Sequence, residues 1–153
     1  MRRFPGSRRY PHFGGEALTA ALGLAGISYR HYADLGGRRG ARAPGSPNTA
    51  WRVEAFNAYA DHMAAPEFAA ALDDLASRAL DTPTALMCSE AVPWRCHRRL
   101  IADALTVRGW AVRDILGPGK VGAHALTDFA RVDGLRLSYP ATPLFPDGGP
   151  AAG

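Results

Sequence analysis

Residues 84–99 form the sequence TALMCSEAVPWRCHRR, which contains both cysteines of the chain. A largely apolar run (84–87) opens this stretch, and a periodicity typical of an amphipathic helix follows it. This order predicts a strand, a short loop and a helix that begins near Pro93. In open α/β folds, ligands bind at the carboxyl ends of strands. The stretch therefore predicts both the fold class and the position of a functional site.

The rest of the chain repeats these two patterns. Helices are predicted over 16–25, 54–63, 66–79, 93–108 and 125–132, and strands over 27–32, 84–87 and 110–116. A long loop rich in glycine and proline separates the first strand from the second helix (34–48). Strands that alternate with helices indicate an α/β fold, a small single domain with a largely parallel sheet flanked by helices. We expect this domain to span residues 1–139 and a flexible tail rich in Pro, Gly and Ala to span 140–153.

Composition and charge limit the classes of function. No apolar run approaches the roughly 20 residues that a membrane helix needs, and two cysteines in 153 residues do not form a disulfide framework, so we expect a cytoplasmic protein without a membrane partner. Residues 1–42 carry eight arginines against two acidic residues, a local charge of +6, whereas the remainder carries −2. A basic third favours an anionic partner, either nucleic acid or a nucleotide-like small molecule.

The residues of the loop predict thiol chemistry. A helix that begins near Pro93 places Cys96 in its first turn, where backbone amides and neighbouring arginines lower a thiol pKa. Cys96 is therefore a candidate nucleophile or redox thiol, with Glu90 or His97 as its acid or base. Cys88 follows the predicted strand, which makes it either a core thiol or a second catalytic thiol.

Three hypotheses about function stay open at this point. The first is an enzyme that acts on an anionic substrate, the second is a non-catalytic module that binds nucleic acid or a metabolite, and the third is a redox switch that links Cys88 to Cys96. Zinc is the cofactor alternative, because cysteine, histidine and glutamate are zinc ligands. The adjacency of Cys96 and His97 argues against zinc, since neighbouring residues of a helix do not face one point.

The predicted substrate ligands are arginines, glycines and one serine, because arginine makes bidentate contacts to phosphate and carboxylate and glycine permits tight turns. They are Arg3, Ser7, Arg8, Gly36, Gly37, Arg38, Arg98 and Arg99.

Several of these segments together resemble a known family, the domain-of-unknown-function family 488. The segments that carry the resemblance are RRFPGSR (2–8), His31 with LGGR (35–38), YADHM (59–63), LMCSE (86–90) and CHR (96–98). The last two fit the hallmark C-x-E-x5-C-H-R of that family. The resemblance implies a small cytoplasmic α/β domain without an assigned reaction. It also implies a preceding β-α-β segment of about 30 residues, so we expect this chain to lack central strands of the family's sheet.

Overall fold

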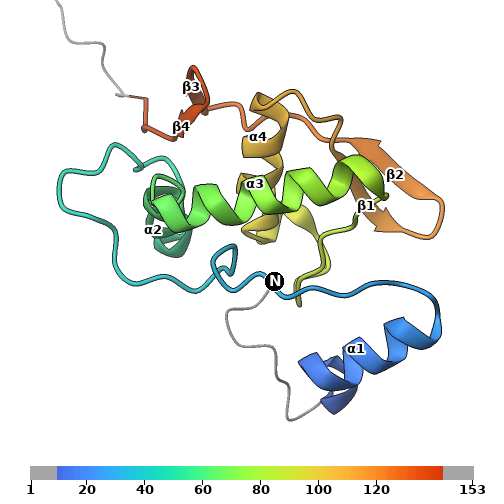
Figure 1. Ribbon diagram of the computed structural model, residues 1–153. Helices are drawn as coiled ribbons and strands as arrows, with labels where there is room; N and C mark the ends of the chain where they lie inside the picture. Colours follow the sequence, from blue (N-terminus) through green and yellow to red (C-terminus); the bar gives the residue numbers. More distant parts are fainter. Residues whose placement is uncertain (1–9, 143–153) are drawn as a thin grey trace, which may run out of the picture.

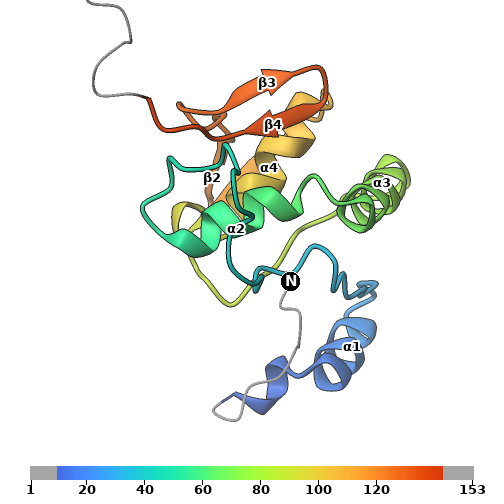
Figure 2. The same cartoon turned by 90° about the vertical axis from the view of Figure 1, so that its left-hand side faces the viewer.

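The computed structural model describes residues 10–142, in which helices and short hairpins surround one core (Figure 1). In chain order the elements are η1 (Pro11–Phe13), α1 (Gly15–Leu24), α2 (Glu54–His62), α3 (Pro66–Asp81), η2 (Pro93–Arg95), α4 (Arg98–Val107), β1 (Arg113–Gly117), β2 (Lys120–Ala123), β3 (Arg131–Asp133) and β4 (Arg136–Ser138). Helices α2, α3 and α4 lie close together, whereas α1 lies apart from them and buries none of its residues (Figure 2). No helix within residues 10–142 is long and apolar enough to cross a membrane.

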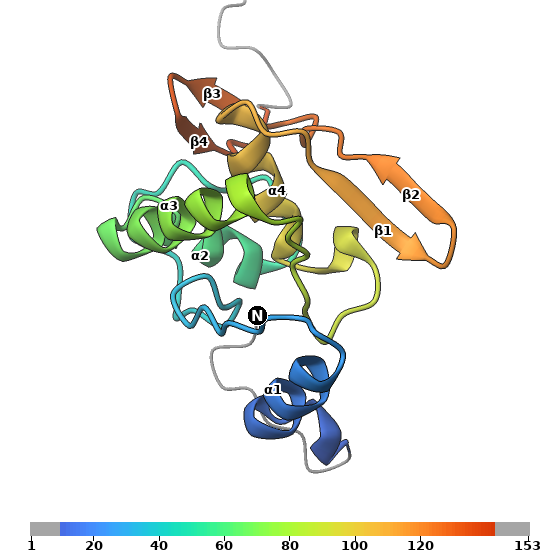
Figure 3. The same cartoon turned by 45° about the vertical axis from the view of Figure 1, so that its right-hand side comes forward.

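The predicted parallel sheet is wrong. The described residues form two separate antiparallel pairs, β1 with β2 and β3 with β4, which lie on different sides of α4 (Figure 3). Strands of a parallel sheet are covered on both faces, but residues 84 and 85 are exposed and the segment 84–87 belongs to neither pair. Residues 27–32 are also outside both pairs, and Ile27 is 53% exposed. Both segments have the composition of strands, but within residues 10–142 neither pairs with another strand.

Local turns explain the two hairpins. Pro118 and Gly119 connect β1 to β2, and Gly119 has φ 68°, which only glycine adopts without strain. Gly134, with φ 57°, begins the turn between β3 and β4. The helix predicted over 125–132 is wrong, because a turn closed by the Ala130 N–H and the Thr127 carbonyl occupies this region and β3 begins at Arg131. The strand predicted over 110–116 is confirmed in part as β1, but its partner is antiparallel.

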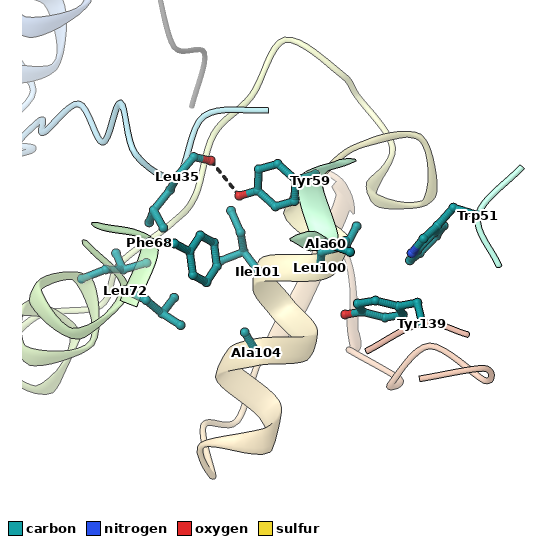
Figure 4. Close-up of a cluster of buried hydrophobic side chains, with 11 residues drawn as sticks. Leu35, Trp51, Tyr59, Ala60, Phe68, Leu72, Leu100, Ile101, Ala104 and Tyr139 are labelled. Carbon is teal, nitrogen blue, oxygen red and sulfur yellow. Dashed lines mark hydrogen bonds between the residues drawn. The ribbon is translucent and has the colours of Figure 1, made fainter. Parts of the chain in front are cut away.

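The helices agree with the amphipathic patterns. Pro66 opens α3, where a missing N–H is harmless, and Phe68, Leu72 and Leu75 are its buried residues. These side chains pack with Leu100 and Ile101 of α4 in one core (Figure 4). That core also includes residues from the long loop, from the segment before α2, from α2 and α4, and from the position directly after β4, namely Leu35, Trp51, Tyr59, Ala60, Ala104 and Tyr139. Burial of this set fixes the position of α4 and of the loop that precedes it.

The segment 34–48 is a loop, as predicted, and specific hydrogen bonds order it. The carboxylate of Asp61 in α2 accepts hydrogen bonds from the Ala43 backbone, the Ser46 hydroxyl and the Asn48 amide. Tyr59 donates a hydrogen bond from its hydroxyl to the Leu35 carbonyl at 2.9 Å (Figure 4). The loop is therefore held against α2 at both ends.

A candidate thiol site at the start of α4

Both cysteines lie on the loop that leads into α4. The extended segment 84–87 ends at Cys88, the chain then makes the single turn η2, and it returns through Cys96 to α4. Cys96 has extended backbone angles (φ −135°, ψ 142°), whereas His97 is the residue before the first turn of α4 (φ −57°, ψ −15°). The prediction of one helix beginning near Pro93 is therefore wrong, because the break at Cys96 divides it into η2 and α4.

This break brings three side chains together. The sulfurs of Cys88 and Cys96 and a ring nitrogen of His97 all lie within 4.8 Å of one another. Cys96 is 2% exposed and His97 is 7% exposed, while Cys88 is only partly buried. Both cysteines are free thiols. The site therefore pairs a partly buried cysteine, Cys88, with a fully buried one, Cys96.

Arg98 holds the loop closed around Cys96. Its Nε donates a hydrogen bond to the Cys96 sulfur at 3.3 Å, and its backbone N–H donates to the same sulfur at 3.5 Å. Its Nη2 donates to the carbonyls of Glu90 and Ala91 on the opposite side of the loop. The side chain of Arg98 thus joins the two halves of the loop and places cationic donors beside a sulfur.

The two thiols differ in acidity. The Cys96 thiol donates its proton toward the Cys88 sulfur, and a backbone hydrogen bond from Glu90 assists, so the pKa of Cys88 is lowered to about 4 despite partial burial. The same hydrogen bond, together with burial, raises the pKa of Cys96 although Arg98 acts in the opposite direction. These shifts favour the thiolate on Cys88, and the role predicted for Cys96 from the sequence stays a prediction.

His97 is buried against the aromatic core and the long loop. Its ring centroid lies 5.1 Å from that of Tyr59, and burial lowers its pKa to about 4, so the imidazole is neutral at pH 7. Its Nδ1 lies 3.7 Å from the Cys96 sulfur. Its Nε2 is buried and has no hydrogen-bond partner among residues 10–142. His97 therefore faces the sulfurs as an uncharged group.

Gly37 lies directly against the His97 ring. A Cβ added at Gly37 would lie 2.3 Å from Nδ1 of His97, so only glycine fits at this approach. Gly36 is buried, and its N–H donates to the Ala33 carbonyl. The sequence predicted both glycines as parts of the site, and the structure places Gly37 in contact with it.

The remaining predicted residues are distributed differently. The side chain of Glu90 is exposed, and Arg38 is exposed next to Gly37. Arg99 donates a hydrogen bond from Nε to the Thr127 hydroxyl at 2.9 Å, and its guanidinium stacks over the Trp51 ring. The guanidinium therefore contacts residues of the fold. Arg3, Ser7 and Arg8 lie outside the described residues.

An apolar groove borders the site. It has a volume of about 410 Å³ and lies between α3, the extended segment that precedes Cys88, α4 and β1. Its lining residues include Leu86, Pro93 and Arg98, which lie on the segment that carries the two cysteines. A substrate held in this groove would lie next to the loop that carries the two sulfurs.

A second polar cluster was not predicted from the sequence. The Asp103 carboxylate is fully buried in α4 and accepts hydrogen bonds from the Tyr139 hydroxyl and the Thr127 backbone. His124 bridges Asp103 and Asp114, with 2.9 Å from each ring nitrogen to a carboxylate oxygen. The sequence feature that could have predicted this cluster is Asp103, a carboxylate within the apolar stripe of a helix. A buried carboxylate requires hydrogen-bond partners.

These observations define a class of protein: a small domain of helices and short hairpins with a cysteine–histidine site where α4 begins. The chain belongs to the family described as "Domain of unknown function DUF488", which matches residues 1–105. The matched range includes both cysteines and His97, and it ends within α4 before the first hairpin. The resemblance found in the sequence is thereby confirmed. No curated protein and no solved structure matches the chain.

Proposed function

We propose that this domain performs thiol–disulfide exchange, with Cys88 as the attacking sulfur and Cys96 as the resolving sulfur. The observation that carries the proposal is the pairing of an accessible thiol with a buried thiol inside one 4.8 Å cluster. Exchange sites need this arrangement, because one sulfur must reach the substrate and the other must reach only its partner.

The exchange reaction has two steps. The Cys88 thiolate attacks one sulfur of a substrate disulfide, and the other substrate sulfur leaves as a thiolate. Cys96 then loses its proton to water and attacks the Cys88 sulfur, which releases the second substrate thiolate and forms a Cys88–Cys96 disulfide. The substrate gains two electrons, and the cysteine pair loses two.

The surroundings of Cys96 support its role as the resolving thiol. Two donors of Arg98, Nε and the backbone N–H, already point at its sulfur, so they are positioned to stabilise the thiolate that forms in the second step. A disulfide requires an S–S distance of about 2.05 Å, and rotation of the partly exposed Cys88 side chain brings the sulfurs together.

The expected preference for an anionic substrate stays a prediction. Arg98 and Arg99 are engaged with protein groups, and Arg38 is the predicted ligand that lies exposed beside Gly37. Nucleic acid, nucleotides and other anionic molecules therefore remain candidates for the partner.

An aromatic disulfide that releases a coloured thiolate tests the exchange reaction directly. The reduced chain should release two coloured thiolates and gain no aromatic adduct in its intact mass, because the second step expels the adduct. Cys96→Ser should release one thiolate and retain one adduct at Cys88. Cys88→Ser should react much more slowly, since the remaining sulfur is buried.

The folded state of each variant is verified by circular dichroism. A stable aromatic adduct on the reduced wild-type chain would refute the proposal, because it would show that Cys96 does not resolve the mixed disulfide. Rapid reaction of folded Cys88→Ser would refute the assignment of the attacking sulfur.

A further inference from the structure

We infer that Cys88, Cys96 and His97 form a binding site for one Zn²⁺ ion, with a fourth coordination position open to solvent or substrate. The inference rests on the geometry of the three side chains and is independent of thiol exchange. Two thiolate sulfurs and one imidazole nitrogen are a donor set that zinc prefers.

The spacing of the donors fits tetrahedral coordination. Zn–S bonds of about 2.3 Å and Zn–N bonds of about 2.0–2.1 Å place neighbouring ligands about 3.5–3.8 Å apart. The Cys96 sulfur lies 3.7 Å from Nδ1 of His97, and all three donor atoms lie within 4.8 Å. The partly exposed Cys88 side chain therefore has to move by about 1 Å at most to complete three of the four tetrahedral positions.

The backbone explains how two adjacent residues contribute to one site. On a continuous helix Cys96 and His97 would point about 100° apart. Here Cys96 is extended and His97 is the residue before α4, so their side chains converge. The adjacency of Cys96 and His97 in the sequence therefore does not prevent both from binding one ion.

The surroundings match those of a metal ligand set. The Arg98 N–H groups donate to the Cys96 sulfur, as donors around metal thiolates commonly do. His97 is 93% buried, and Nδ1 is the ring nitrogen that lies 3.7 Å from the Cys96 sulfur, so this nitrogen is placed as the imidazole ligand. Two thiolates also neutralise the charge of the ion, which matters because the site is largely buried.

Zinc binding and disulfide formation exclude each other at this site. A Cys88–Cys96 disulfide has no thiolate to offer, and zinc-bound thiolates are not free to attack. If the chain also performs exchange, metal occupancy therefore controls how much of it is active.

Cobalt and zinc titrations test the site on the reduced full chain after its metal has been removed with a chelator. Co²⁺ should produce one equivalent of tetrahedral d–d absorption and a sulfur-to-cobalt charge-transfer band, and Zn²⁺ should displace it. Cys88→Ser, Cys96→Ser and His97→Gln should each weaken Zn²⁺ binding by more than about tenfold in competition with a chromophoric chelator.

His12→Gln provides the matched control, because it removes an exposed histidine far from the loop in sequence, and it should leave the affinity unchanged. Absence of the charge-transfer band from the folded wild-type chain would overturn the inference. An unchanged affinity in Cys88→Ser or His97→Gln would overturn it as well. These readouts do not depend on exchange, so failure of the metal site and failure of the exchange reaction are distinguished by the aromatic disulfide assay.

Discussion

Gly37→Ala is the substitution that most specifically probes how the long loop supports the site. The added methyl carbon would lie 2.3 Å from Nδ1, 2.7 Å from Cε1 and 2.8 Å from Cγ of His97. Carbon atoms in normal contact are about 3.5–4.0 Å apart, so the loop or the ring has to move by roughly 1 Å. His97 is buried against Tyr59 and has little room to do so.

The expected loss of stability follows from this overlap. Overpacking a buried site typically destabilises a protein by about 1–3 kcal/mol. For a chain of this length, each kcal/mol lowers the melting temperature by about 2–4 °C. We therefore expect Gly37→Ala to lower the melting temperature by about 2–12 °C, and to weaken Zn²⁺ binding because His97 is displaced.

Gly40→Ala is the matched control, because it adds the same methyl group to the same loop and meets nothing within 4 Å. Urea titrations followed by circular dichroism should give a free energy of unfolding within about 0.5 kcal/mol of wild type for this control. Equal stability of the two variants would refute the contact between Gly37 and His97.

Two further predictions concern the remaining structure. Hydrogen bonds to Asp103 and to Asp114 raise the pKa of His124 above its unfolded value near 6.5. The protonated ring therefore stabilises the fold fully below about pH 6.5, and this contribution is lost as the pH rises through the folded pKa. Urea midpoints measured across this range should fall with rising pH and should fall less in His124→Gln; parallel curves would contradict the bridge. Tyr59→Phe leaves the buried Leu35 carbonyl without its donor and should lower the free energy of unfolding by about 1–3 kcal/mol, measured by chemical denaturation; no change would show that another donor replaces the hydroxyl.

The sequence predicts α1, α2 and α3 well because their signals are local. Pro66 and the stripe of Phe68, Leu72 and Leu75 suffice to define α3, since each depends only on neighbouring residues. The sheet could not be predicted in the same way. Residues 84–87 have the composition of a buried strand, but strand pairing depends on distant segments, and none pairs with them within residues 10–142.

The candidate site was predicted by composition but not by geometry. The sequence directs attention to Cys88, Cys96 and His97, because they lie in one short loop, and the structure brings these three side chains together. The assignment of Cys96 as the activated thiol stays a prediction, but the single helix from Pro93 on which it was based is wrong. The single turn η2 and the extended Cys96 leave Cys96 buried and Cys88 partly buried. No local sequence propensity predicts the break at Cys96.

The central claim, that Cys88 is the accessible sulfur and Cys96 the shielded one, is tested most directly by alkylation. The reduced, folded chain would be treated briefly with iodoacetamide, quenched and digested, and the modified fraction of each cysteine measured by peptide mass spectrometry. A denatured sample provides the reference rates. The account predicts that Cys88 is modified first and that Cys96 reacts only once the chain is unfolded. Modification of Cys96 before Cys88, or equal modification of both in the folded chain, would contradict it.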